Sequence, residues 1–519
     1  MPPRAPVRLL LLAWLPALAA QAAPAVECEV AVVGAGWAGV YSAWRLAVDA
    51  GPASTGGVPA GQVCVFEAYR RPGGRTYTTQ IEDYRVDVGA YRFAGDMHLP
   101  ADLIMAALRL PTSCYDPTCN DSDVRGEVAW PYAQPLRKIV DSSGRHAGYG
   151  VALDTMLDQL AAAGARLAFG TELVGVSGCD GMWCLSFRDG VAVRSARVVL
   201  NVPRPALARV EGVEQAVGRR WAALACVSRQ FPKHVTEGST TVKVYAVYDD
   251  AWWISRLNLT RGVAEDMGDP PVSIHYHDGE VVCSDQVDPG GKPVWATARR
   301  SSDLRRCRGV LQVFYRHSQL CPASTPHCMD FWASQPRANS AEPAEVLTEG
   351  GAVDSPALRQ RVHEKLLKMH APQSAQRNVS LAGIAPPTAL VYSVWAHSGT
   401  FPEGDLGMQS GPQDVIFEDS LASVCSGVSS PREYEDMVQG TGNWSGIAPG
   451  LHFANNDFAA TRSAAWHGPW AEASLLIAER ILAGAFGLPR PSWLNGTYYA
   501  REVGLRGSAR AAYPRQVLV

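Results

Sequence analysis

The sequence predicts an α/β protein in which a domain built on a parallel sheet is interleaved with an α+β domain. The apolar strand Glu29–Val33 runs directly into a glycine turn and a helix, which is a common start of a parallel sheet. A second strand follows at 62–66, and helix and strand patterns return at 147–208 and 441–485. The stretches between these sections are rich in aromatic residues and Pro/Gly turns, so we assign them to the second domain.

The turn after the first strand has the spacing of a dinucleotide-binding site. Gly34 makes the turn, Gly36 lets the backbone approach a pyrophosphate, and Gly39 lets the helix lie against the sheet. The phosphates would sit at the helix N-terminus, where free amide N–H groups favour negative charge. The second strand ends in Glu67, whose carboxylate can accept hydrogen bonds from both ribose hydroxyls of an adenosine.

The residues after the second strand carry a more specific pattern. VFEAYRRPGGRTYT contains Gly73, Gly74 and Arg75, and YRVDVGAYRF, with Gly89 and Ala90, follows it. These segments resemble the flavin-containing amine oxidase family of the monoamine oxidase and L-amino acid oxidase type. The resemblance implies a Rossmann-like FAD-binding domain, interleaved with an α+β substrate-binding domain. It places Gly74 and Arg75 on the flavin diphosphate side, and Gly89 and Ala90 near the isoalloxazine ring.

Two later segments extend the resemblance. TTVKVYAVYDDAWW places Lys243 where the family has a strand lysine that reaches a water at flavin N5. LHFANNDFAATRSAAWHGPW places Asp457 near the flavin ribityl chain and Trp470 at the aromatic wall of the substrate site, although Asn455 and Asn456 replace a small glycine-containing pair. A buried lysine is costly without a partner, so the alternative for Lys243 is a position at a strand edge. The alternative for Trp470 is ordinary helix core.

Arg92 decides the expected substrate. The run from Asp87 to His98 resembles the L-amino acid oxidase branch, in which an arginine three residues after the glycine binds the substrate carboxylate. A guanidinium offers a planar fork that matches a carboxylate, whereas monoamine and polyamine oxidases do not need such a fork. The alternative is that Arg92 pairs with a structural carboxylate or with the flavin phosphate.

Further aromatic residues are expected around the substrate amine, because flat rings complement a transient cation. SGTF, which contains Phe401, resembles a shortened form of the family's S-G-G-C-Y segment, and Trp395 is the alternative. Thr400 then stands where some members carry a flavin-linking cysteine. The resemblance therefore implies noncovalent FAD, with Lys243, Trp470 and Phe401 as catalytic residues.

The composition agrees with a two-domain enzyme in the secretory pathway. At 519 residues, 47% hydrophobic and 19% charged, the chain can bury two cores, and its net charge of −3 gives no sign of a nucleic-acid partner. Arg4 and Arg8 precede the apolar run Leu9–Ala20, a secretory signal pattern too short for a membrane span, and no later stretch reaches spanning length. N-x-S/T sequons, which are compatible with glycosylation, occur at Asn120, Asn258, Asn378, Asn443 and Asn495.

Twelve cysteines fit the same compartment. Three pairs are close enough in sequence for local disulfides, although order alone does not fix pairing: Cys114 with Cys119, Cys179 with Cys184, and Cys321 with Cys328. Reduced, buried cysteines are the alternative. These loops lack the ligand spacing of a zinc site, so no metal is expected.

The chain order gives the expected domains. They are a signal peptide at 1–23, FAD-binding parts at 26–93, 147–208 and 441–485, a substrate-domain insert at 94–146, the substrate-binding domain at 209–440, and a C-terminal tail at 486–519.

Three functions remain open at this point. The first is a secreted L-amino acid oxidase that converts amino acid and oxygen into oxo acid, ammonia and hydrogen peroxide. The second is a monoamine or polyamine oxidase, if Arg92 points elsewhere. The third is a non-catalytic secreted flavoprotein, which the change at Asn455 and Asn456 permits. The expected partners are a small amine or amino acid and oxygen.

Overall fold

The structure of the chain is a computed structural model. It describes residues 26–115, 136–221, 240–287, 293–297, 307–317, 321–335, 344–348, 355–395, 431–441, 446, 448–458 and 470–504. The expected signal peptide and Phe401 lie outside these ranges. Within them, no helix combines the length and the apolar character needed to cross a membrane.

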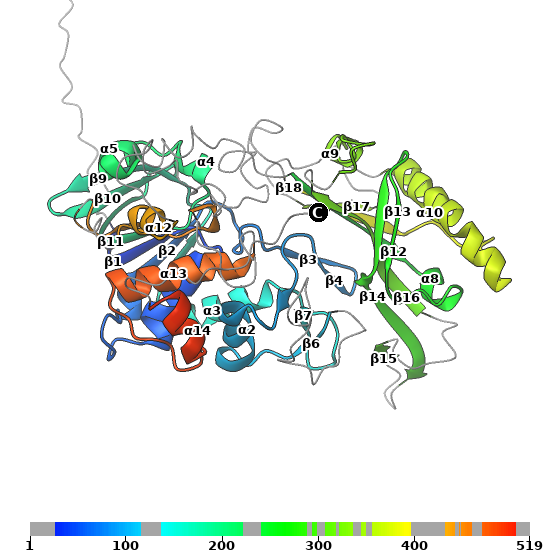
Figure 1. The fold of residues 1–519 in the computed structure, drawn as a ribbon, viewed down its shortest axis with the longest axis horizontal. Helices are drawn as coiled ribbons and strands as arrows, with labels where there is room; N and C mark the ends of the chain where they lie inside the picture. Colours follow the sequence, from blue (N-terminus) through cyan, green and yellow to red (C-terminus); the bar gives the residue numbers. More distant parts are fainter. Residues whose placement is uncertain are drawn as a thin grey trace, which may run out of the picture.

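The first sheet forms one lobe of the molecule (Figure 1). Among the described residues it has seven strands in the order β8-β2-β1-β11-β10-β9, with β19 paired to β11. Their bounds are β1 Val26–Val33, β2 Val63–Glu67, β8 Arg166–Phe169, β9 Leu173–Cys179, β10 Met182–Phe187, β11 Ala192–Leu200 and β19 Leu451–Phe453. β1, β2, β8, β11 and β19 run parallel. The carboxyl ends of parallel strands therefore meet at one edge, where such sheets bind ligands.

Helices from distant parts of the chain pack beside this sheet. α1 (Trp37–Trp44) contacts both α3 (Val151–Ala162) and α13 (Ala471–Ala485). Glu479 of α13 is buried and accepts a 2.7 Å hydrogen bond from the Tyr41 hydroxyl, and it lies 3.1 Å from the Arg45 guanidinium. These buried contacts fix α13 against the helix that follows the glycine turn.

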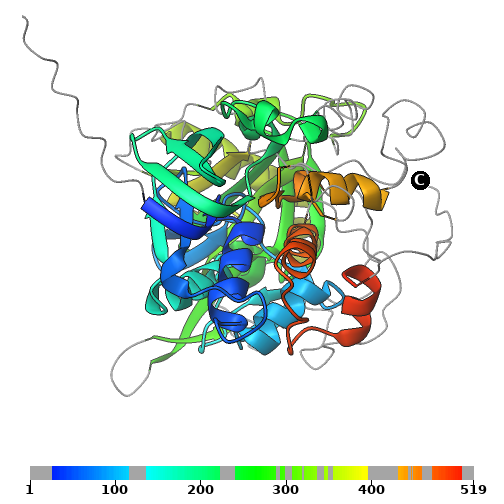
Figure 2. The ribbon, with the colours of Figure 1, turned by 90° about the vertical axis from the view of Figure 1, so that its left-hand side faces the viewer.

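Two segments outside the expected FAD-binding parts pack against the first lobe. α2 (His98–Asp102) donates the Leu99 N–H to Glu472 of α13 at 3.0 Å, and its apolar residues join the core of the first lobe. α14 (Gly496–Glu502) donates the Tyr498 hydroxyl to the same carboxylate. Apolar residues of the described part of segment 94–146, and of segment 486–504, therefore belong to the hydrophobic core of the first lobe. Figure 2 shows this lobe from its own side, with α14 in red.

The second sheet forms the other lobe, with α10 (Pro356–Arg377) on its outer face (Figure 1). Among the described residues it has seven strands in the order β13-β14-β16-β12-β18-β17, with β15 on β14, and all its pairs are antiparallel. Their bounds are β12 Thr241–Tyr248, β13 Val263–Asp266, β14 Val272–Val287, β15 Pro293–Thr297, β16 Cys307–His317, β17 Ala344–Thr348 and β18 Ala389–Trp395.

Shorter elements connect the lobes. The hairpin of β3 (Thr78–Ile81) and β4 (Tyr84–Asp87) packs against the inner face of the second sheet. β5 (Phe93–Ala94), β7 (Leu136–Ile139) and β6 (Thr112–Cys114) form a small sheet. The other short α-helices of the described residues are α4 Arg204–Leu207, α5 Val213–Val217, α8 Trp252–Ser255, α9 Asp330–Ala333 and α12 Pro431–Gln439.

Strand alternation gives the second sheet an apolar outer face and a partly polar inner face. On β12, Val242, Val244 and Ala246 pack in the core beneath α10, so Lys243 and Tyr245 point the other way, toward the β3–β4 hairpin. Successive side chains of a strand point to opposite faces. The inner face is therefore the one that meets the first lobe.

Disulfides tie both lobes locally. Cys179 pairs with Cys184, and Cys321 pairs with Cys328, as predicted. Cys28 pairs with Cys64 and joins β1 to β2, a bridge that sequence order did not suggest. Cys114 is also disulfide-bonded, and its expected partner Cys119 lies outside the described residues.

Candidate dinucleotide and substrate site

The glycine turn after β1 has no room for side chains. A Cβ on Gly34 would lie 2.2 Å from the Asn201 carbonyl oxygen, and one on Gly39 would lie 1.9 Å from the Gly34 oxygen. A Cβ on Gly36 would lie 2.9 Å from the Asn201 side-chain nitrogen. Gly34 also has a φ of +97°, which other residues rarely adopt. This close approach is what a backbone cradle for a pyrophosphate requires.

Glu67 lies at the end of β2, inside this turn. Its Oε2 accepts the Ala35 N–H at 2.7 Å, and its Oε1 accepts the Tyr69 N–H at 2.9 Å. Burial raises the pKa of Glu67, and these backbone hydrogen bonds oppose that shift. Because a carboxylate has about four acceptor positions, Glu67 retains the capacity to accept ribose hydroxyls.

The second glycine pair lies against the first turn. Gly73 donates its N–H to the Ala35 oxygen at 2.8 Å, and a Cβ on Gly74 would lie 3.9 Å from the Gly36 Cα. A Cβ on Gly73 would lie 2.2 Å from the Thr76 oxygen, so this turn also needs glycine. The two motifs, separated in sequence, thus form one continuous backbone surface.

Arg75 and Asp457 meet although they are far apart in the sequence. The Arg75 Nη2 lies 3.1 Å from the Asp457 Oδ1, 3.0 Å from the Asn455 Oδ1 and 2.5 Å from the Asn456 Oδ1. The other oxygen of the buried Asp457, Oδ2, accepts a hydrogen bond from the backbone N–H of Arg204 at 3.1 Å. The two asparagines that depart from the family pattern therefore both hold Arg75.

Lys243 reaches from the second sheet to the backbone of the first lobe. It is buried, and its Nζ donates to the Gly89 oxygen at 2.6 Å and to the Asp87 oxygen at 3.1 Å. The Tyr91 ring centroid lies 3.5 Å from Nζ. Burial lowers the pKa of Lys243 well below its usual value, and the nearby Arg92 lowers it further, while Asp87 opposes the shift. The site therefore favours a neutral amine.

Segment 88–90 is held from two sides. Gly89 packs so closely that a Cβ would lie 2.2 Å from the Arg75 oxygen, and the Ala90 N–H donates to that oxygen at 3.0 Å. From β18, the Trp395 indole N–H donates to the Val88 oxygen at 2.7 Å. Trp395 is buried, and it contacts the main chain next to Gly89 and Ala90, the residues predicted to lie near the flavin ring.

Arg92 lies among aromatic rings. Its guanidinium carbon is 4.5 Å from the Tyr91 ring centroid, 4.7 Å from that of Tyr115 and 5.8 Å from that of Trp470. Trp470 is half-buried and precedes the first residue of α13. Arg92 and Trp470 are therefore brought together, whereas Phe401 lies outside the described residues.

Sequence reasoning missed several residues of this region. The Asn201 side chain connects two segments. Its Nδ2 donates to the Gly34 oxygen at 3.2 Å, and its Oδ1 accepts from the Asn455 Nδ2 at 3.2 Å. The position of Asn201 in the sequence could have indicated it, because Asn201 directly follows β11, the strand that pairs parallel with β1. Asp278 is also present near Arg92, and burial raises its pKa to about 7. Its proximity to Arg92 depends on a strand irregularity that no motif marks.

The residues present fit a flavin dinucleotide. The turn excludes side chains, Glu67 closes its adenosine end, and Arg75 with Asp457 lines the continuation toward Gly89. When bound, FAD would supply a two-electron acceptor, which is chemistry that amino-acid side chains lack.

Comparisons with known proteins give the following similarities. Wild-type putrescine oxidase bound to putrescine is 12% identical, with 89% of this chain and 99% of that chain covered and a TM-score of 0.48. Two variants from a redesign of cofactor binding in the same enzyme are 14% and 13% identical, with equal coverage and TM-scores of 0.47 and 0.48. The curated proteins contain no match to the chain. Residues 32–101 match the model of a protein family described as the NAD(P)-binding Rossmann-like domain. The chain therefore carries a Rossmann-like dinucleotide-binding domain within a mixed α/β fold.

Proposed function

We propose that the protein is an FAD-dependent oxidase of amino groups and that its substrates are L-amino acids. The observation that carries the proposal is the contact of Lys243 with the Gly89 and Asp87 oxygens. This contact joins the polar inner face of the second sheet to the end of the dinucleotide cradle. The products would be an oxo acid, ammonia and hydrogen peroxide.

Lys243 would hold a water near flavin N5. A neutral amine has two N–H donors and one lone pair, and the two carbonyl oxygens occupy both donors. Its lone pair is then left to accept a hydrogen bond from water, and burial, which lowers the pKa of Lys243, favours this neutral form. An ammonium at this place would offer no acceptor.

Arg92 would bind the substrate carboxylate. Its guanidinium plane is packed by Tyr91 and Tyr115, which restricts its orientation, while its N–H edge can engage a planar anion. Trp470 lies on the same side and would bound the space for the substrate amine. In a water-poor site this ion pair would be stronger than at the surface.

A monoamine or polyamine oxidase is the second candidate. The aromatic rings around Arg92 favour it, because a guanidinium packed against rings can stabilise the site without binding a substrate carboxylate. The buried carboxylate of Asp278 near Arg92 would in that case provide negative charge close to a substrate ammonium.

Anaerobic flavin reduction separates these candidates. The visible spectrum of the purified protein is recorded before and after addition of mixed L-amino acids, and then with monoamines and polyamines in a second sample. Bleaching of the flavin by amino acids alone is the expected result. Bleaching by amines alone would move the assignment to the second candidate, and no bleaching by either mixture would contradict both.

We also propose that the flavin is noncovalent and that the chain is located in the secretory lumen. The Cys28–Cys64, Cys179–Cys184 and Cys321–Cys328 disulfides support an oxidising compartment. Denaturation followed by filtration should release all the flavin, and the mature protein from eukaryotic cells should lack residues 1–23. Flavin retained on the denatured chain, or an intact N-terminus, would contradict these two points.

A further inference from the structure

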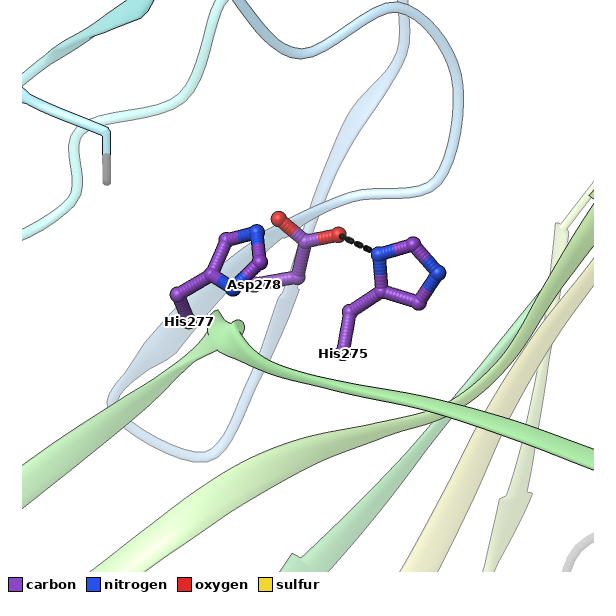
Figure 3. Close-up of side chains that lie close together, drawn as sticks. All are labelled: His275, His277 and Asp278. Carbon is purple, nitrogen blue, oxygen red and sulfur yellow. Dashed lines mark ion pairs between the residues drawn. The ribbon is translucent and has the colours of Figure 1, made fainter. Parts of the chain in front are cut away.

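His275, His277 and Asp278 form a compact cluster on β14 (Figure 3). One potential ligand atom from each side chain lies within 4.8 Å of those of the other two. The Asp278 Oδ2 is 3.5 Å from the His275 Nδ1, and the two imidazole centroids are 5.9 Å apart. In Figure 3 the carboxylate lies between the two rings.

The backbone explains why three residues so close in sequence converge. Val272, Ile274 and Tyr276 pack under α10, so His275 and His277 point to the inner face of the sheet. The pairing of β14 with β16 shifts register between His275 and Glu280.

That irregularity turns Asp278 onto the same face as the two histidines, which regular alternation would prevent. Gly279 allows it, because a Cβ there would lie 2.0 Å from the Val310 oxygen. The convergence is therefore built into the strand.

The carboxylate of Asp278 is the unusual member of the cluster. Its side chain has 0% exposure, and neither oxygen has a hydrogen-bond partner among the described residues. Burying a carboxylate without hydrogen bonds or a close counterion is costly, so such groups commonly pair with a cation or bind a metal. Asp278 forms an ion pair with His275, which is charged only when its imidazole is protonated, and Arg92 adds positive charge nearby.

We propose that His275, His277 and Asp278 bind one divalent transition-metal ion of the zinc type. Two imidazole nitrogens and one carboxylate oxygen are a ligand set that suits Zn²⁺ and leaves a fourth position open. Ligand atoms around tetrahedral Zn²⁺ are about 3.4 Å apart, so the side chains must close by rotation about their torsions.

The surroundings define the expected character of this site. Rings wall it on two sides, with Tyr115 centred 5.1 Å from His277 and Tyr315 centred 5.8 Å from His275. The positive charge of Arg92 opposes a bound cation, so we expect weaker binding than at a site with several carboxylates. The site would therefore load when the metal is supplied and be emptied by a chelator. The expectation of no metal rests on the cysteine loops, and these three residues lie outside them.

The test uses the full-length protein without an affinity tag, stripped with a chelator and dialysed. Zn²⁺ binding is titrated in competition with a chelating dye, and Co²⁺ is added to a second sample to record its visible absorption. We expect about one ion per chain and the intense absorption of a low-coordinate Co²⁺ site. Asp278→Asn and His277→Ala should each weaken Zn²⁺ binding by at least about tenfold.

His327→Ala is the matched control, because His327 and Asp330 form a second histidine–aspartate pair, also 3.5 Å apart, that is exposed. It should bind Zn²⁺ like the wild type. Unchanged binding in both cluster variants, or equal loss in the control, would overturn the proposal. If the cluster variants fail to fold, metal binding by the wild-type protein is the test. Less than about 0.2 ions bound per chain, or Co²⁺ absorption of the weak octahedral type, would overturn the proposal.

Discussion

The two sheets contribute to the candidate site in different ways. In the first lobe the backbone forms the surface, since Gly34, Gly39 and Gly73 leave no space for a Cβ. In the second lobe side chains form it, with Lys243 and His275 projecting from the inner face of an antiparallel sheet. A backbone cradle suits a constant ligand such as a dinucleotide. A surface of side chains can be altered one residue at a time and suits the choice of substrate.

The largest effect is expected from a substitution in the backbone surface of the first lobe. Gly39→Ala would put a methyl group 1.9 Å from the Gly34 oxygen and separate α1 from the sheet. We expect the purified variant to retain less than about a tenth of the wild-type flavin, measured by absorbance after denaturation. Gly178→Ala is the control, because a Cβ there meets nothing within 4 Å. Normal flavin content in Gly39→Ala would mean that the cradle does not hold the cofactor.

The next effect separates chemistry from cofactor binding. Lys243→Met keeps an unbranched, buried side chain but removes the amine from the Gly89 and Asp87 oxygens. We expect flavin content to stay normal while kcat/KM falls by about 10²–10⁴. Steady-state kinetics with hydrogen peroxide detection checks this, with Lys365→Met, at a lysine paired with Asp266, as the control. Wild-type activity in Lys243→Met would show that the Lys243 amine of the second sheet takes no part in the reaction.

A smaller effect concerns the stability of the first lobe. Burial raises the pKa of Glu472 to about 8, whereas its value in the unfolded chain is near 4.5. Between these values the folded state binds more protons than the unfolded state, so stability falls as pH rises from about 4.5 to 8. The loss is on the order of a few kcal/mol.

Glu472→Gln should therefore flatten the fall in Tm between pH 5 and pH 8.5. The amide oxygen can accept the Leu99 N–H, and the amide N–H can donate to the Tyr498 oxygen, so the local contacts can persist. Thermal unfolding of both proteins at matched ionic strength measures the difference. Parallel Tm curves would show that Glu472 does not titrate in this range.

The two lobes also differ in how much their sequences reveal. The glycine turn and Glu67 could be read from the sequence, because the three glycines follow an apolar strand at a fixed spacing and Glu67 ends the next strand, and the structure places them in one cradle. The Cys28–Cys64 bridge and the Asn201 contacts depend on which strands are neighbours, and Asp278 depends on a register shift between β14 and β16. No short motif encodes these.

The packing of two segments outside the expected FAD-binding parts has a similar cause. The expected FAD-binding parts end at Phe93 and at Ala485. In the structure, Leu99 and Tyr498 contact Glu472 and complete the first core. Core membership depends on which apolar surfaces meet in space. The roles of Lys243, Arg92 and Trp470 remain predictions that kinetics must test.

Arg92 provides the most direct test of the central claim, which is that the side-chain half of the site selects amino acids. The measurement is kcat/KM for L-amino acids and for the corresponding primary amines, in wild type, Arg92→Ala, Arg92→Lys and the exposed control Arg188→Ala. We predict that Arg92→Ala loses about 30-fold to a few thousand-fold with amino acids, equivalent to about 2–5 kcal/mol, and changes little with amines. Arg92→Lys should recover only part, because an ammonium lacks the planar fork. Equal losses for both substrate classes, or no loss for amino acids, would contradict the claim.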